Sequence, residues 1–355
     1  MRRQSAPPLS KPRLCGIVAP MRNSRFALTP EDVGIILTYR CHSRCAHCLY
    51  NCGPAWGKDD AMDSDTLRQA LEAITLWPQH PQVHLTGGEP FLHFDLLLAG
   101  ARIATELGIS AYVETSASWC TDEDQARDRF QALRQAGLQA VLISCSPFHA
   151  AHIPPARTLQ AIHAARQVFG AQRVMVYLAH YLPLLQRLGL EQPIPLETYE
   201  ATYGPEEAGR LLWHSHGLIS GGRAGYALGH LVDKHPAAAF SGETCAGELL
   251  HAHHSHFDLY GNYISGFCGG LAVGDWHDLP QVLDDFQAGR YPVAVDVLIE
   301  QGPYGLYHMA QRDYDYQPLE EGYTGKCHLC VDIRKHLVHS GDFPTLRPEA
   351  FYDHI

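Results

Sequence analysis

The segment Val33-Gly-Ile-Ile-Leu-Thr38 and the loop Cys41-His-Ser-Arg-Cys45-Ala-His-Cys48 together decide the interpretation of this chain. The first is a short apolar run of mostly aliphatic residues, which predicts a buried β-strand. The second brings three thiols within eight residues, close behind the end of that strand. Cysteines at this spacing can coordinate a metal centre from one side. The two stretches therefore predict a strand that carries a metal-binding loop at its C-terminal end.

Apolar strand-like runs continue to alternate with amphipathic helix-like runs as far as about residue 220. This alternation predicts a parallel sheet covered by helices. Six βα units are too few to close an eight-stranded barrel, so we expect an α/β fold, either a partial (β/α)6 TIM-like barrel or an open doubly wound sheet. The expected strands are 33–38, 83–86, 109–114, 138–144, 174–179 and 217–220, and the expected helices follow Asp63 or Ser64 and cover 94–107, 121–137 and 156–169.

The composition of the chain changes at about residue 236. Gly, His, Tyr and Asp become dense there, and the main remaining amphipathic stretch is Leu279–Gln287. Gly261-Asn262 is a turn pair between β-prone runs, which predicts a hairpin. We therefore expect a small, irregular α+β domain in this region. The expected units are an irregular N-terminal arm (1–30), the α/β domain (31–235), the smaller domain (236–340) and a C-terminal tail (341–355).

Charge and cysteine content narrow the class of protein. The 355 residues include 27 basic and 38 acidic side chains, a formal net charge of −11. Nucleic acids and anionic membranes are bound mainly through clustered Lys and Arg, so we expect neither as a partner. The N-terminus lacks an apolar export signal, and no 18-residue apolar run occurs. The absence of a visible export signal indicates a reducing compartment, and the eleven cysteines, an odd number, cannot all pair in internal disulfides, so a cytoplasmic metal-binding protein is expected.

The first cysteine loop is compatible with two kinds of metal centre. Three thiolates on a cubane of four irons leave one iron open, and iron–sulfur clusters are held by cysteine thiolates. Zinc would need a fourth ligand, for which His42 or His47 is close by. Structural zinc sites usually have a second cysteine pair, and none lies near this loop. The spacing therefore favours an iron–sulfur cluster without excluding zinc.

A second motif, Thr86-Gly87-Gly88-Glu89-Pro90, follows the next expected strand. With the CxxxCxxC loop, it resembles the radical S-adenosylmethionine (SAM) superfamily and its GGEP motif. The resemblance implies that the three loop cysteines hold a [4Fe-4S] cluster whose open iron is chelated by SAM. Cleavage of SAM would yield a 5′-deoxyadenosyl radical that abstracts a hydrogen atom. The glycines would let backbone approach the cofactor closely, and Glu89 would receive its ammonium group.

The same resemblance assigns further cofactor contacts at the strand ends. His47 stands where such enzymes often carry an aromatic residue against the adenine. Glu114, Thr115 and Ser116 end the third strand, and Ser144 ends the fourth, where Ser146 replaces a common Asp. Arg223 belongs to a Gly-Arg-Ala sequence that recurs in one branch of the superfamily. For the Ser and Thr residues, a role as helix N-caps is an equal alternative.

Four later cysteines form a second set: Cys245, Cys268, Cys327 and Cys330. Four thiols suit a closed site for zinc or for an iron–sulfur cluster. Their arrangement around the expected hairpin resembles the SPASM or shorter twitch extension of radical SAM enzymes, which implies one auxiliary [4Fe-4S] cluster. The histidine run in 251–256 (His251, His253, His254, His256) is interpreted as mostly solvated. Cys15, Cys52 and Cys120 are expected to be ordinary apolar core residues.

These observations predict a radical SAM enzyme that oxidises a small molecule by two electrons and passes one to the auxiliary cluster. An electron donor such as flavodoxin or ferredoxin would supply the first cluster. Cys145 is a candidate hydrogen-atom donor, and His149 is a candidate base because histidine titrates near neutral pH. Two alternatives remain open. The chain could modify a ribosomal peptide by thioether or carbon–carbon crosslinking or by epimerisation, or it could be a non-catalytic iron–sulfur or zinc-stabilised binding protein.

Overall fold

The computed structural model describes residues 28–215 and 217–355. Most of the expected N-terminal arm (1–30) and Cys15 lie outside the described residues. Within them, no helix is both long and apolar enough to cross a bilayer.

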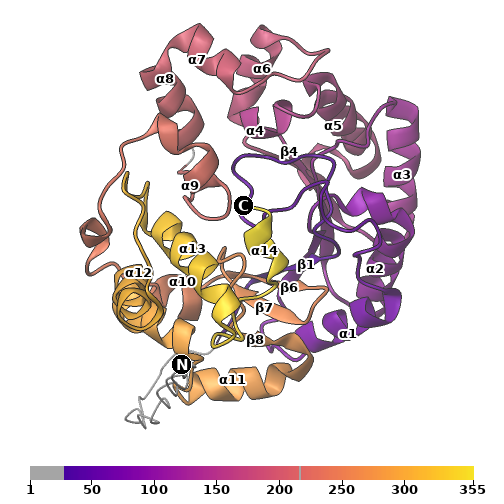
Figure 1. Cartoon of the computed structure of the whole chain (residues 1–355). Helices are drawn as coiled ribbons and strands as arrows, with labels where there is room; N and C mark the ends of the chain where they lie inside the picture. The colour runs from indigo at the N-terminus through magenta and orange to yellow at the C-terminus, as the bar shows by residue number, and fades with distance from the viewer. Residues whose placement is uncertain (1–27, 216) are drawn as a thin grey trace, which may run out of the picture.

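One eight-stranded sheet organises the described chain (Figure 1). Its order is β5-β4-β3-β2-β1-β6-β7-β8, with parallel pairing from β5 through β6 and antiparallel pairing in the last two steps. The sheet has two free edges, β5 and β8, so it is not a closed barrel. The strands are β1 (Asp32–Ile36), β2 (Gln82–Thr86), β3 (Ala111–Thr115), β4 (Ala140–Ser144), β5 (Val174–Tyr177), β6 (His254–Asp258), β7 (Asn262–Ser265) and β8 (Gly274–Asp275).

The first five strands confirm the expected βα alternation. From β1 to β5 each strand lies beside the next one in sequence, and the order reverses only at β1, where β6 joins on the opposite side. Val33 and Ile35 of β1 are fully buried in one apolar cluster with Leu67 of α1. The helices that follow β1 to β4 are α1 (Ser64–Ile74), α2 (Phe94–Glu106), α3 (Glu123–Gln135), α4 (Pro147–Ala150) and α5 (Pro155–Phe169).

Side-chain caps set where two of these helices begin. Asp63 accepts a hydrogen bond from the Thr66 amide, as the sequence predicted for α1. The cap of α3 is Asp122, one residue after the expected Thr121, and its carboxylate accepts from the Gln125 amide. A carboxylate at this position satisfies an amide that has no partner within the helix and interacts favourably with the helix dipole.

The expected sixth strand at 217–220 is wrong. These residues form a loop, because the chain just after them is held against the cysteine loop: the Arg223 amide donates to the Cys48 carbonyl at 3.2 Å. The sixth parallel strand is instead β6, which pairs with β1 on the opposite side from β2. The helices between β5 and β6 are α6 (Leu182–Leu188), α7 (Glu197–Tyr203), α8 (Pro205–Gly209), α9 (Ala224–Ala227) and α10 (Ala246–Leu250).

The region after residue 236 continues the same sheet. The predicted hairpin is present as β6 and β7, and Trp77 packs on Phe257 and Tyr263 of that hairpin with ring centroids 5.8 Å apart in each case. One apolar cluster therefore includes residues from both sides of the composition change.

Two long helices in this region were not predicted from sequence. Helix α12 (Val293–Tyr314) is interrupted at Gly302-Pro303, where the backbone is non-helical, so its apolar period is broken. Helix α13 (Lys326–Leu337) begins on the CxxC pair, which reads as a metal-binding loop in sequence alone. The amphipathic stretch Leu279–Gln287 forms helix α11, and α14 (Ala350–Asp353) lies near the C-terminus.

Candidate active site

The C-terminal part of the parallel sheet and the cysteine loop surround one cavity of about 350 Å³. This volume suits a small molecule. Strands β2 to β5 and β6 all contribute side chains to its wall, from Tyr177 on β5 to His256 on β6. The predicted placement of ligands beyond the strand ends therefore corresponds to a real cavity.

Cys41, Cys45 and Cys48 line this cavity together, and Cys52 joins them. Burial raises the pKa of the Cys41 thiol to about 12, and burial also holds the pKa of Cys45 well above its usual range. A hydrogen bond with Cys52 instead lowers the pKa of Cys48 to about 6. The Ser43 amide donates to the Cys41 sulfur at 3.4 Å. A backbone donor aimed at sulfur stabilises negative charge there, so the loop fits an anionic cluster.

Arg223 holds the cysteine loop in place rather than facing the cavity. Its guanidinium is buried and donates to the carbonyls of Cys45 at 3.2 Å, His354 at 3.0 Å and Cys52. The C-terminal tail, predicted only as a tail, contributes to the same support, because the Asn51 side chain donates to the Phe351 carbonyl at 3.0 Å. The loop is thus fixed by residues more than 170 positions away in sequence.

Gly87 and Gly88 pack against the backbone that leads into the cysteine loop. A Cβ at Gly88 would lie 2.0 Å from the Arg40 carbonyl oxygen, and one at Gly87 would lie 2.3 Å from that of Thr38. The Gly88 amide also donates to the Thr38 carbonyl at 2.7 Å. The sequence interpretation had the glycines approaching a cofactor. Both do line the cavity, but the closest approach is to the protein's own chain.

Glu89 is completely buried and turned toward the end of β3. Its carboxylate accepts hydrogen bonds from the Thr115 hydroxyl at 2.8 Å and from the amide and hydroxyl of Ser116 at 3.1 and 2.5 Å. Burial raises the pKa of Glu89, and these hydrogen bonds oppose that rise. The three predicted residues are therefore brought together, with Glu89 joined to Thr115 and Ser116 instead of facing the cavity.

The remaining predicted cofactor contacts do line the cavity: His47, Glu114 and Ser144. His47 stacks on Phe148 with ring centroids 4.5 Å apart. Glu114 accepts a hydrogen bond from the Thr86 hydroxyl at 2.9 Å.

His149 and Cys145, the two predicted catalytic residues, have different surroundings. His149 lines the cavity, and its Nδ1 lies 2.7 Å from the Ser146 hydroxyl. Burial lowers the pKa of His149 to about 4. Cys145 is 1% exposed, belongs to an apolar cluster with Phe148 and Tyr199, and is not part of the cavity wall. Because side chains alternate along a strand, Ser144 faces the cavity and Cys145 does not.

Several cavity residues were missed from sequence, above all His84 on β2 and Tyr112 on β3. Buried parallel strands are usually apolar throughout, so polar residues within them were the available signal. The four histidines of the run 251–256 have two kinds of environment. His251 and His253 are exposed as expected, whereas the β6 residues His254 and His256 line the cavity.

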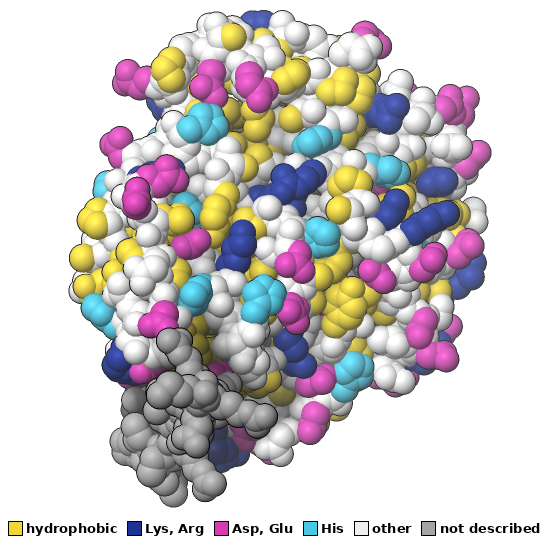
Figure 2. All heavy atoms as spheres, in the orientation of Figure 1, with side chains coloured by type: hydrophobic (Ala, Val, Ile, Leu, Met, Phe, Trp, Pro, Cys, Tyr) yellow, Lys and Arg dark blue, Asp and Glu magenta, His cyan; other side chains and the backbone are white. Residues whose placement is uncertain are grey.

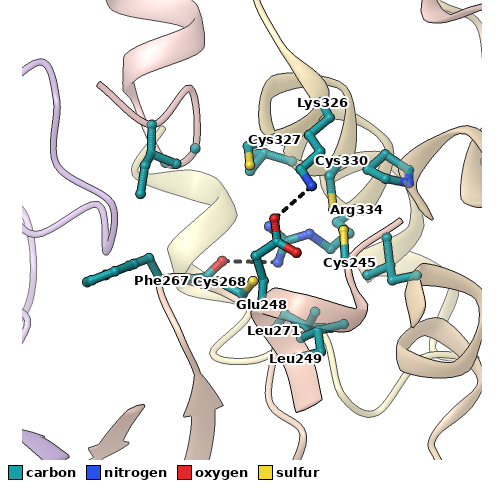
Figure 3. A pocket seen from close by; sticks show the side chains of 17 residues that line it. Cys245, Glu248, Leu249, Phe267, Cys268, Leu271, Lys326, Cys327, Cys330 and Arg334 are labelled. Carbon is teal, nitrogen blue, oxygen red and sulfur yellow. Dashed lines mark hydrogen bonds and ion pairs between the residues drawn. The ribbon is translucent and has the colours of Figure 1, made fainter. Parts of the chain in front are cut away.

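A second, smaller cavity holds the other cysteine set (Figure 3). Cys245, Cys268, Cys327 and Cys330 all line it: Cys245 lies at the start of α10, Cys268 follows β7, and Cys327 and Cys330 are both on α13. Burial raises the pKa of Cys268 and of Cys327 to about 12. Lys326 stands over the same cavity and forms an ion pair with Glu248 at 2.7 Å.

Arg334 supplies a buried positive charge beside these thiols. Burial lowers the pKa of its guanidinium, but Tyr352, Cys330 and Cys268 outweigh burial and raise it, so Arg334 stays cationic. Its Nε is buried without a hydrogen-bond partner among the described residues. An orphaned cationic donor facing a group of thiols fits an anionic metal cluster.

Comparison with known proteins concerns mainly the part of the chain that contains the first site. Residues 35–178 match the profile of the Radical SAM superfamily. The chain carries a radical SAM superfamily domain. GTP 3′,8-cyclases from two strains of Corynebacterium glutamicum are each 30% identical over 125 residues, or 34% of this chain. The match spans 32% of each cyclase, about a third of its length.

Solved structures similar to this chain share little sequence with it. BtrN in complex with AdoMet and 2-DOIA is 11% identical, with a TM-score of 0.41 over 77% of this chain and 89% of that one. Native anSMEcpe with bound AdoMet is 10% identical, with a TM-score of 0.42 over 88% of this chain and 98% of that one.

The superfamily implies a [4Fe-4S] cluster and SAM, and the residues of the first cavity fit them. Cys41, Cys45 and Cys48 would hold the cluster, with the Ser43 amide and the buried Arg223 charge beside it. When bound, cluster and SAM supply a 5′-deoxyadenosyl radical. The protein's own share is to hold the loop, shape the cavity and position the substrate.

Proposed function

We propose that this chain is a radical SAM enzyme that oxidises a small molecule by two electrons, with an auxiliary [4Fe-4S] cluster on Cys245, Cys268, Cys327 and Cys330 as electron acceptor. The observation that carries the proposal is that these four thiols, from three separate parts of the sequence, line one cavity. After a hydrogen atom leaves the substrate, the substrate radical would lose one electron to the auxiliary cluster and one proton to a base.

The two cavities are neighbours, which supports electron transfer between them. Phe267 lines both. A Cβ on Gly221, which lines the second cavity, would lie 3.3 Å from the Leu49 side chain and 3.8 Å from Cys327. Leu49 follows Cys48 directly and lines the first cavity. One layer of side chains therefore separates the two groups of thiols.

The spacing of the four auxiliary thiols favours a cluster over zinc. Sulfur ligands about 2.3 Å from one tetrahedral zinc ion lie about 3.8 Å apart. No three of these four thiols, all in the described part of the chain, have sulfur atoms within 4.8 Å of one another. A polynuclear cluster, which holds its cysteines farther apart, suits that spacing better than a single ion.

The wall of the active-site cavity favours a substrate with hydroxyl or amino groups. Tyr112 and Tyr177, which have no predicted role toward the cofactor, offer hydrogen-bond partners for such groups. None of the described residues that line this cavity is Lys or Arg. A nucleoside triphosphate, the substrate named by the cyclase relatives, would need such cations for its phosphates. On the outer face of the molecule shown in Figure 2, acidic and basic side chains are intermixed.

His149 stays the proposed base. It lines the cavity, and burial keeps it neutral at pH 7, so a ring nitrogen can accept a proton. Its lowered pKa makes it a weak base, which suits an acidic proton such as the one beside a radical centre.

Anaerobic reconstitution tests the proposal. The wild-type protein should bind about eight iron atoms and form 5′-deoxyadenosine from SAM with reduced flavodoxin or ferredoxin. The triple variant Cys41→Ala/Cys45→Ala/Cys48→Ala should lose about four irons and all 5′-deoxyadenosine formation. The pair Cys327→Ala/Cys330→Ala should lose the other four while still cleaving SAM. Four irons or fewer in the wild type, without 5′-deoxyadenosine, would refute it.

The substrate class is tested with the same preparation. Incubation with pools of polyols and amino alcohols should give products lighter by two hydrogens, detected by mass spectrometry. Crosslinking or epimerisation of a peptide, with no such small-molecule product, would establish the peptide-modifying alternative instead.

A further inference from the structure

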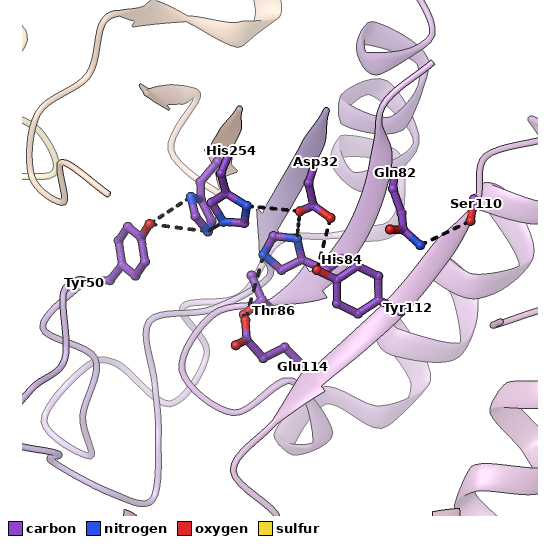
Figure 4. Close-up of polar contacts among 10 residues, drawn as sticks. Asp32, Tyr50, Gln82, His84, Thr86, Ser110, Tyr112, Glu114 and His254 are labelled. Carbon is purple, nitrogen blue, oxygen red and sulfur yellow. Dashed lines mark hydrogen bonds and ion pairs between the residues drawn. The ribbon is translucent and has the colours of Figure 1, made fainter. Parts of the chain in front are cut away.

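Three histidines meet on the cavity face of the sheet, and neither the cysteine sites nor the superfamily accounts for them (Figure 4). His84 lies on β2, and His254 and His256 lie on β6. Strands β2 and β6 flank β1, so these residues come from the two sides of the central strand. One ring nitrogen of each histidine lies within 4.8 Å of one from each of the others.

Gly34 on β1 makes this meeting possible. It is in register with His84 on one side and with His256 on the other. A Cβ at Gly34 would lie 2.5 Å from Nε2 of His84 and 2.7 Å from Nε2 of His256. Any side chain here would therefore occupy the space in which the two imidazoles approach each other.

The Nδ1 atom of each ring has an oxygen atom within 3.2 Å. Nδ1 of His84 and Nδ1 of His254 lie 2.6 and 3.2 Å from the same Asp32 oxygen. Nδ1 of His256 lies 2.8 Å from the Tyr50 hydroxyl. Metal-bound histidines usually hold their second ring nitrogen in this manner, which fixes the tautomer and orients the ring.

The Nε2 atoms of the histidines lie in the space between the rings. Nε2 of His254 and Nε2 of His256 are 3.3 Å apart. Two nitrogens each about 2.05 Å from one tetrahedral zinc ion would be about 3.4 Å apart. Small rotations would bring Nε2 of His84 to the third position. Glu114, whose carboxylate lies 3.9 Å from Nε2 of His84, adds negative charge nearby.

We propose that His84, His254 and His256 bind one divalent transition-metal ion, with Zn²⁺ as the best fit. Three protein nitrogens leave a coordination position open, and all three histidines line the cavity that holds the cysteine loop. That position takes an oxygen or nitrogen donor of a molecule bound in the cavity. The role toward a substrate rests on the proposed function, whereas metal binding itself does not.

A metal-free arrangement of the same atoms predicts different results. In it, the Tyr50 hydroxyl donates to Nδ1 of His256, and Nε2–H of His256 donates to Nε2 of His254. This arrangement satisfies both contacts without an ion and gives no specific zinc binding.

Zinc titration of the anaerobically reconstituted wild-type protein separates the two. Elemental analysis should find one zinc per chain in addition to iron, and zinc-edge X-ray absorption should show nitrogen and oxygen neighbours. His254→Gln and His256→Gln should each weaken zinc binding at least tenfold with iron content unchanged. Gly34→Ala should do the same without removing a ligand. The control His253→Gln, at an exposed residue of the same segment, should bind zinc as the wild type does.

Three outcomes would overturn the proposal: no zinc beyond that in the His254→Gln variant, sulfur neighbours in the absorption spectrum, or zinc affinity unchanged in both histidine variants. Zinc is measured without turnover, so an inactive protein that binds zinc through nitrogen would refute the proposed function but not this site.

Discussion

Replacing Arg223 by alanine should destabilise the protein by about 3 kcal/mol and release the first cluster. The buried guanidinium donates to the carbonyls of Cys45, Cys52 and His354. A hydrogen bond from a charged group contributes about 1.5–3 kcal/mol, and losses from one side chain do not add fully. Removing the cation also exposes the thiolate-rich loop to greater charge repulsion.

The assay compares thermal midpoints and iron retention of anaerobically reconstituted variants. A loss of about 3 kcal/mol lowers the midpoint of a chain of this size by about 4 °C. Arg44→Ala is the matched control, because exposed Arg44 makes one hydrogen bond from the same loop to the Ile355 carbonyl. It should shift stability by no more than about 0.5 kcal/mol.

Arg223→Lys covers the case in which the alanine variant fails to fold. Lysine keeps the charge but lacks the planar fork that reaches three carbonyls, so an intermediate midpoint is expected. If Arg223→Ala matched Arg44→Ala in both midpoint and iron content, the reasoning that Arg223 holds the loop would be refuted.

Three further variants test other parts of the structure. Cys145→Ala should leave the rate of 5′-deoxyadenosine formation and the product unchanged, because the thiol lies outside the cavity wall; an altered product would restore its donor role. The folded-state pKa of His149 is lowered to about 4, so the unfolded chain takes up its proton first and stability should fall as the pH drops from about 6.5 to about 4. His149→Gln should flatten that part of a pH–stability curve, and an unchanged curve would count against the burial of the ring. Arg334→Gln should lower the auxiliary-cluster potential by on the order of 60 mV, measured by redox titration, because a cation stabilises the reduced cluster; an equal or higher potential would contradict this.

Local patterns predicted the first half of the fold well. The strands β1 to β5 and their helices follow from apolar runs bounded by turn residues and caps, which depend on neighbours in sequence. The same analysis missed α12, because Gly302-Pro303 breaks its period. It also placed a strand at 217–220, where long-range contacts with the cysteine loop hold the chain in another conformation.

The candidate site was likewise predicted only in part from the sequence. The CxxxCxxC and GGEP motifs were visible because the spacing of their residues is itself the chemical requirement, and the superfamily match agrees with them. The orientation of side chains was not visible. Glu89, in the loop after β2, proved to be held toward Ser116 by long-range hydrogen bonds, and Cys145 points away from the cavity because the pleat of a strand and the register of its neighbours decide which way a residue faces.

The sequence by itself determined that the chain begins as a βα series whose first strand delivers a three-cysteine loop, since that information is local. Only the tertiary structure decided which distant residues meet. It brought four thiols from three separate parts of the chain into one cavity, placed Arg223 against the cysteine loop, and set His84 beside His254 and His256 across Gly34. The physical reason is strand pairing: β6 joins β1 in a particular register, and no local pattern in either strand specifies that partner.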